Sequence, residues 1–141
     1  MSVDDGNGPD ERSTVSIGLH EGFIVARAVG DLDYASAGPL KQQIREAWAM
    51  TQSGGLVVDL SGLTFCDSMG VGVLVLLLRQ SREQQSTLVL SGMPPHLERV
   101  LDITGLLTAF QVEASVEEAI QVVQAGPRPA AEQSPDERGP A

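Results

Sequence analysis

The residues of this sequence best suited to chemistry lie in the tetrapeptide Asp67-Ser68-Met69-Gly70. The serine carries a hydroxyl that can accept a phosphoryl group or act as a nucleophile, and a carboxylate precedes it. An apolar run at 56–60 comes before the tetrapeptide and a second apolar run follows it, a pattern typical of a buried strand, a turn and a helix that begins near Ser68. Because free backbone N–H groups at a helix start attract phosphate, the pattern predicts a hydroxyl at an anion-binding helix end.

Strand and helix signals alternate around this segment. Apolar runs at 14–19 and 23–29 predict a hairpin, and the residues from Gly30 to Asp33 are expected to end its second strand. Asp33 is the expected N-cap of an amphipathic helix that ends near 50–54. Run 56–60 is typical of a parallel strand covered on both faces. The remaining predicted elements are a helix from 68 to about 84, a strand at 87–90, a short helix around 97–101, an edge strand at 109–112 and a helix at 116–123 capped by Ser115. This order predicts an α/β fold, with a mixed, mostly parallel sheet of four to five strands flanked by about four helices.

Length and composition indicate one domain. The chain has 141 residues, of which 42% are hydrophobic, and we expect a folded unit at 13–125 between disordered tails at 1–12 and 126–141. A formal net charge of -10 argues against nucleic acid or an anionic membrane as partner. Cys66 is the only cysteine, so an internal disulfide is excluded. The start resembles no signal peptide, and the longest strictly apolar stretch, 73–78, is too short to cross a bilayer, so we expect a cytoplasmic protein.

The helix after Ser68 is apolar on two sides. One stripe is the expected core face, made of Val71, Leu74, Val75 and Leu78. The opposite side is made of Met69, Val73, Leu76 and Leu77. Such a helix is either covered by neighbouring helices or has a face reserved for a partner beside Ser68, and the pattern leaves both interpretations open.

Three segments together resemble the STAS domain of bacterial anti-sigma factor antagonists. They are Gly30-Asp31-Leu32-Asp33, then VVDLSGLTFCDSMGVGVL at 57–74, then Leu101-Asp102-Ile103-Thr104-Gly105-Leu106. The resemblance covers about 15 to 123. It implies a compact sheet flanked by helices and a regulator of transcription that switches partners. In that family the unphosphorylated antagonist binds an anti-sigma factor, usually a serine kinase, and frees the sigma factor. The kinase then phosphorylates the antagonist, which is released until a phosphatase resets it.

Carried over by position, the resemblance makes Ser68 the phosphorylated residue and Asp33 an acidic residue near it. The expected partner-binding set is Asp33, Asp67, Ser68, Met69, Gly70, Val73, Leu76 and Leu77. The partners would be an anti-sigma factor kinase and a phosphatase that acts on phosphorylated Ser68. Met69 departs from the family pattern, in which a small residue is common at this position.

Three alternatives remain. Ser68 could serve only as a helix N-cap, and the domain could bind partners as a scaffold without being phosphorylated. The third is a serine hydrolase, but Cys66 occupies the position of the first glycine in a nucleophile elbow. Neither His20 nor His96 has an evident orienting partner, so a general base is missing. Metal and nucleotide motifs are absent, and we therefore expect no enzyme activity, cofactor or metal.

Overall fold

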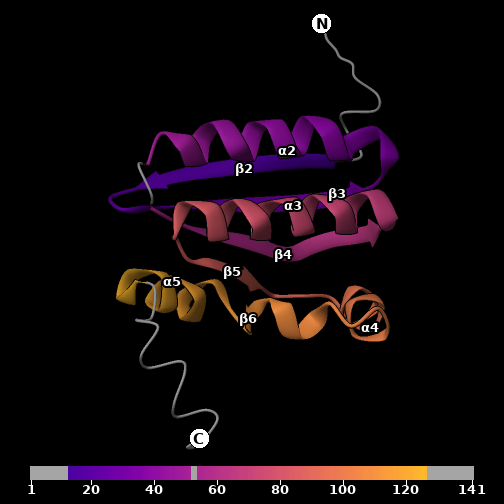
Figure 1. Cartoon of the computed structure of the whole chain (residues 1–141). Helices are drawn as coiled ribbons and strands as arrows, with labels where there is room; N and C mark the ends of the chain where they lie inside the picture. Colours follow the sequence, from indigo (N-terminus) through magenta and orange to yellow (C-terminus); the bar gives the residue numbers. More distant parts are fainter. Residues whose placement is uncertain (1–12, 52–53, 127–141) are drawn as a thin grey trace, which may run out of the picture.

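The computed structural model describes residues 13–51 and 54–126, and the tails expected at the two ends lie almost entirely outside these ranges. A five-stranded sheet has the order β2-β3-β4-β5-β6 (Figure 1). Its strands are β2 (Ser13–His20), β3 (Phe23–Leu32), β4 (Gly55–Cys66), β5 (Leu88–Ser91) and β6 (Gln111–Glu113). β2 and β3 form an antiparallel hairpin and the other neighbours pair in parallel. The predicted mixed, mostly parallel sheet is therefore confirmed.

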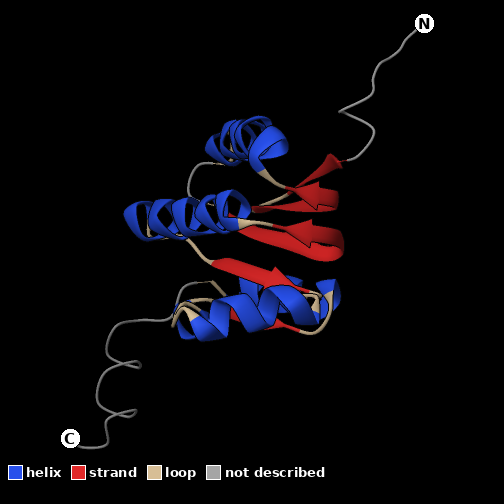
Figure 2. Cartoon of the chain, turned by 90° about the vertical axis from the view of Figure 1, so that its right-hand side faces the viewer, coloured by secondary structure: helices blue, strands red, loops and turns tan. Residues whose placement is uncertain are grey.

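Four α-helices connect and cover the strands. They are α2 (Tyr34–Ala49), α3 (Ser68–Gln84), α4 (Pro95–Ile103) and α5 (Val116–Ala125), with a short 3-10 helix at Leu107–Ala109. α2 and α3 lie side by side on one face of the sheet (Figure 2). Their apolar residues join Ile24, Leu56 and other strand residues in the main core. α5 packs on the opposite face, because its Val123 belongs to a second core cluster with Val57, which alternates with Leu56 along β4.

The two central strands are longer than the sequence predicts. β3 continues through Leu32 rather than ending at Gly30, and β4 continues to Cys66 rather than ending at 60. Two register shifts, between Arg27 and Val29 and between Gly30 and Asp31, let the strands remain paired past the apolar runs. The extension matters for the site, because it pairs the last residue of β3, Leu32, with the last residue of β4, Cys66.

Candidate functional site

β3 and β4 end side by side, and each leads directly into a helix. Leu32 and Cys66 are paired across the two strands, and the Asp67 N–H donates to the Leu32 carbonyl over 3.2 Å. The next residue along each chain segment, Asp33 or Asp67, is the N-cap of the helix that follows. The parallel pairing therefore brings the N-termini of α2 and α3 together at one end of the sheet.

Asp33 caps α2 as the sequence predicts. Its Oδ1 accepts from the N–H groups of Ala35 at 3.1 Å and Ser36 at 3.2 Å. The Ser36 hydroxyl oxygen in turn accepts from the Asp33 N–H at 3.0 Å, which completes a capping box. The Asp33 side chain is thus held at the start of α2 by local hydrogen bonds.

Asp67 binds both helices at once. Its Oδ1 accepts from the N–H groups of Met69 at 2.9 Å and Gly70 at 3.2 Å, which caps α3. Its Oδ2 accepts from the Tyr34 N–H, the first residue of α2, at 3.3 Å. One carboxylate therefore fixes the start of α3 against the start of α2.

Ser68 is the first residue of α3, and it is exposed. The alternative that Ser68 serves as the N-cap is wrong, because Asp67 fills that position. Within the described part of the chain, the Ser68 hydroxyl makes no hydrogen bond. The expectation of free N–H groups also needs correction, since Asp67 already holds those of Met69 and Gly70. A phosphate on Ser68 would meet a carboxylate where the sequence suggested an empty anion site.

Gly70 lies where α3 comes close to the end of β3. A Cβ built on it would lie 2.6 Å from the Leu32 carbonyl oxygen and 2.7 Å from the Cys66 sulfur. The glycine is therefore required by packing, and it is buried. Its expected place among the partner contacts is wrong, because β3 covers it.

The expected docking face of α3 is only half exposed. Val73 is 4% exposed and Leu77 is 0% exposed, so both belong to the core and their predicted partner contacts are wrong. Met69, at 48%, and Leu76, at 37%, do face solvent. The reason is that α3 packs against both the sheet and α2. These two neighbours together cover a wider part of the helix surface than a single apolar stripe. Of the stripe expected to be core, only Leu74 is fully buried.

Two exposed aromatic residues lie near Ser68 in the chain or at the neighbouring helix start, and neither belongs to the predicted partner-binding set. Tyr34, 80% exposed, follows the Asp33 cap, and its N–H binds Asp67. Phe65, also exposed, lies two residues before Asp67 and pairs with Asp31 on β3. The sequence offers a signal for Tyr34, an aromatic residue directly after the Asp33 cap, whereas Cys66 separates Phe65 from the Asp67 cap.

The Cys66 thiol beside the site is kept protonated. Burial, and secondarily the Asp67 carboxylate, raise the pKa of Cys66 from 9.0 to about 11. The sulfur lies in contact range of Gly70 and is partly buried, so it acts as a packing residue.

The geometry does not support a hydrolase at Ser68. In a nucleophile elbow the N–H after the serine helps to stabilise the oxyanion, whereas the Met69 N–H is bound to Asp67. His20 stacks on Phe23 at the hairpin, with ring centroids 4.7 Å apart. Phe23 pairs with Gly55, at the opposite end of β4 from Ser68, so His20 cannot serve as general base there.

Residues 13–51 and 54–126 contain neither a cluster of metal-binding side chains nor a membrane-spanning helix. That part of the chain contains no group of three or more His, Cys, Asp or Glu side chains placed to hold a metal ion. None of its helices has the length and apolar character needed to cross a bilayer.

Comparison with known proteins defines the class of this chain. The STAS domain model matches residues 15–119, so the chain belongs to the STAS domain family. A putative anti-sigma factor antagonist, BtrV of Bordetella bronchiseptica, is 33% identical over 101 residues, covering 70% of this chain and 84% of that protein. A crystal structure of an anti-sigma factor antagonist from Mycobacterium paratuberculosis is 25% identical with a TM-score of 0.69, covering 79% and 94% of the two chains.

A third comparison concerns fold alone. The Bacillus cell fate determinant SpoIIAA in its phosphorylated form is 24% identical, with a TM-score of 0.62 over 78% of this chain and 99% of that one. These comparisons place the chain among the STAS-domain anti-sigma factor antagonists.

Proposed function

We propose that this protein is a partner-switching antagonist controlled at Ser68. Unphosphorylated, it binds an anti-sigma factor that is also a serine kinase, and so frees a sigma factor for transcription. Phosphorylation of Ser68 by that kinase releases the antagonist, and a phosphatase restores it. The observation that supports this most is the exposed Ser68 hydroxyl, which is free of hydrogen bonds within the described residues and directly follows the Asp67 cap of α3.

The physical basis of the switch is charge. A phosphate adds about -1.5 to -2 charges at pH 7. At this point Asp33 and Asp67 already supply negative charge, so a partner surface complementary to the neutral serine would be repelled. A loss of about 3 kcal/mol would weaken binding by roughly two orders of magnitude. SpoIIAA, which shares this fold, exists in a phosphorylated form, and that is consistent with a fold that tolerates the modification.

The proposed contact surface surrounds the serine. Asp33 and Asp67 would provide its charge, and the side chains of Met69 and Leu76 its apolar area on α3. The exposed aromatic rings of Tyr34 and Phe65 extend that area across α2 and β4. Aromatic and methionine side chains are enriched at protein interfaces, which supports this assignment.

The test is phosphoryl transfer from purified anti-sigma factor kinases of the source organism with ATP, with the modified residue mapped by mass spectrometry. We expect phosphate on Ser68 of the wild type and none on Ser68→Ala, which still binds the kinase. Ser68→Asp should bind at least about tenfold more weakly, because it adds a charge at the contact. Phosphate on another residue would refute the assignment. Tight binding without any phosphoryl transfer would instead favour a STAS module that acts as a scaffold.

A further inference from the structure

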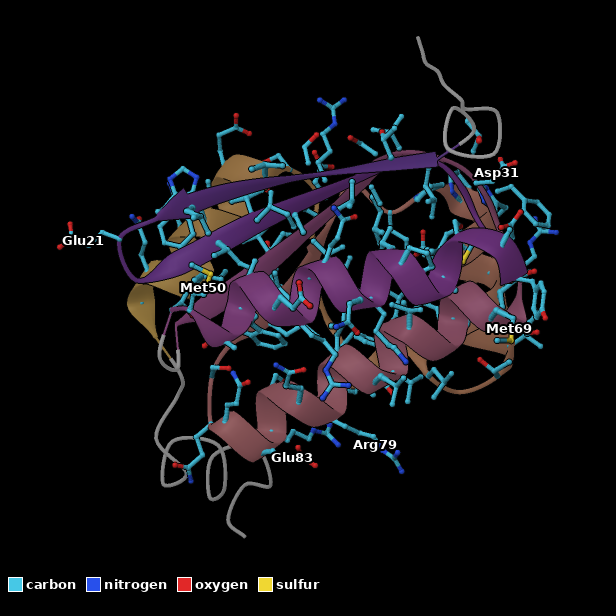
Figure 3. The ribbon with its side chains drawn as sticks, turned by 90° about the horizontal axis from the view of Figure 1, so that it is seen from above. Glu21, Asp31, Met50, Met69, Arg79 and Glu83 are labelled. Carbon is cyan, nitrogen blue, oxygen red and sulfur yellow. The ribbon has the colours of Figure 1, made fainter. Side chains whose placement is uncertain are left out.

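The exposed side of α3 forms a continuous strip that leads away from Ser68. Positions three or four residues apart share one side of a helix, and Met69, Gly72, Leu76, Arg79 and Glu83 follow that spacing. Figure 3 shows Met69, Arg79 and Glu83 spread along the outer side of α3, with Met69 and Asp31 at the same end of the molecule. From Ser68 to Arg79 the helix rises about 16 Å, a length that one protein interface of ordinary size covers.

Gly72 is not required by packing against the described residues. A Cβ built on it would have none of their heavy atoms within 4 Å outside its own stretch of helix, in contrast to the contacts below 3 Å at Gly70. Glycine weakens a helix interior, so a glycine that no packing contact requires is unfavourable for folding alone. It leaves bare backbone one turn after Ser68, between the exposed Met69 and Leu76 side chains. Because Gly72 has no side chain, the surface of another protein can come close to the α3 backbone at this position.

Charge is separated along the same surface. The Ser68 end carries Asp31, Asp33 and Asp67, whereas Arg79 and Arg82 are exposed toward the other end of α3. Within the described residues the only ion pair is Arg27 with Asp59, so neither Arg79 nor Arg82 is in a salt bridge, and with the exposed Glu83 beside them this end of α3 still carries one net positive charge. In a chain with a net charge of -10, cations kept together and unpaired can attract a carboxylate-bearing surface.

We propose that the strip Met69–Gly72–Leu76–Arg79 orients the bound anti-sigma factor. The partner would lie against the bare backbone at Gly72, with its basic groups toward Asp33 and Asp67 and its carboxylates toward Arg79 and Arg82. This inference rests on the proposed function and adds the orientation of the complex and its specificity. It also extends the footprint well beyond the phosphorylated serine.

The first test varies side-chain size at Gly72, with binding measured to the anti-sigma factor kinase that binds the wild type. Gly72→Ala should raise the midpoint of thermal unfolding while weakening binding, and Gly72→Gln should weaken binding by at least about tenfold. The matched control is Ala125→Gln, which adds a similar side chain at an exposed position of α5 on the other face of the sheet. Wild-type affinity of folded Gly72→Gln would overturn the close approach.

The second test compares two double variants that change the net charge by the same amount at different places on the surface. Arg79→Gln with Arg82→Gln lowers the net charge by two, as does the control Gln121→Glu with Gln124→Glu on α5. We expect the arginine pair to slow association at low salt by about threefold or more, the difference shrinking as salt rises, and the control to stay near wild type. Equal effects of the two pairs would overturn the charge assignment. If no anti-sigma factor binds the wild type, the proposed function fails and this inference falls with it; if binding and Ser68 phosphorylation hold, only the inference is at stake.

Discussion

Replacing Gly70 by alanine should destabilise the domain, although alanine favours helix. The new Cβ would lie 2.6 Å from the Leu32 carbonyl oxygen, 2.7 Å from the Cys66 sulfur and 2.8 Å from the Leu32 Cγ. The sulfur and the Leu32 side chain can shift, but the carbonyl belongs to the last residue of β3. That residue is fixed by its pairing with β4 and by the bond from the Asp67 N–H.

The size of the effect follows from two opposing terms. Alanine gains about 1 kcal/mol over glycine in a helix interior. Overpacking a filled site costs about 1–3 kcal/mol, and a backbone contact places this site at the upper end. The net loss should therefore be about 1–2 kcal/mol. Gly72→Ala has the same propensity gain without a contact within 4 Å, so it should be more stable than wild type by up to about 1 kcal/mol.

The assay is urea unfolding of the two variants, followed by the fluorescence of Trp48, the single and fully buried tryptophan. The midpoints should fall on opposite sides of wild type, with a gap of about 2–3 kcal/mol in the free energy of unfolding. If Gly70→Ala is as stable as Gly72→Ala, the close approach of α3 to β3 is refuted.

Two further predictions concern α3 and its neighbour. Leu76→Glu should abolish binding to the anti-sigma factor while changing the free energy of unfolding by less than about 0.5 kcal/mol. Leu77→Glu should unfold the domain, because it buries a charge. Similar unfolding curves for the two variants would contradict the assignment of Leu76 to the exposed side of α3 and of Leu77 to the core. Cys66 in the native protein should react with iodoacetamide at pH 8 about 100-fold more slowly than in the urea-unfolded chain, because a pKa of about 11 instead of 9.0 leaves far less thiolate. The same shift stabilises the fold fully below about pH 9 and loses that contribution as the pH rises toward 11. Equal alkylation rates would show that the thiol is not protected.

Much of the fold could be predicted because it is encoded locally. The caps at Asp33 and Ser115 depend on a side chain and N–H groups two or three residues away, and both predictions are confirmed. The order of strands and helices follows from apolar runs and periodicity in the same way. The late parts of β3 and β4 were missed, because partly exposed strands such as 61–66 are held by cross-strand pairing rather than by an apolar run.

The candidate site was harder to predict for two physical reasons. Asp67 and Ser68 are both good N-caps, and periodicity cannot separate adjacent residues, so only the hydrogen bonds identify Asp67 as the cap. The second reason is that, when a helix is apolar on all sides, its hydrophobic pattern does not indicate which side faces the core. The packing of α3 against both α2 and the sheet decides which apolar residues are covered, and Val73 and Leu77 are buried while Leu76 stays exposed.

The double role of Asp67 determines where a phosphate at Ser68 could act. The N–H groups of Met69 and Gly70 are already bound to the Asp67 carboxylate, so a phosphate could use them only by displacing it. Displacement would also break the bond from the Tyr34 N–H that joins the starts of α2 and α3. Without displacement, the phosphate adds its charge next to a fixed carboxylate on the surface. In both cases the change would stay within the first turns of α2 and α3, whereas core residues such as Ile44 of α2 and Leu74 of α3 lie further along the helices. The domain would therefore present the signal as surface charge on a fixed scaffold, and a partner that covers Ser68 would detect it directly.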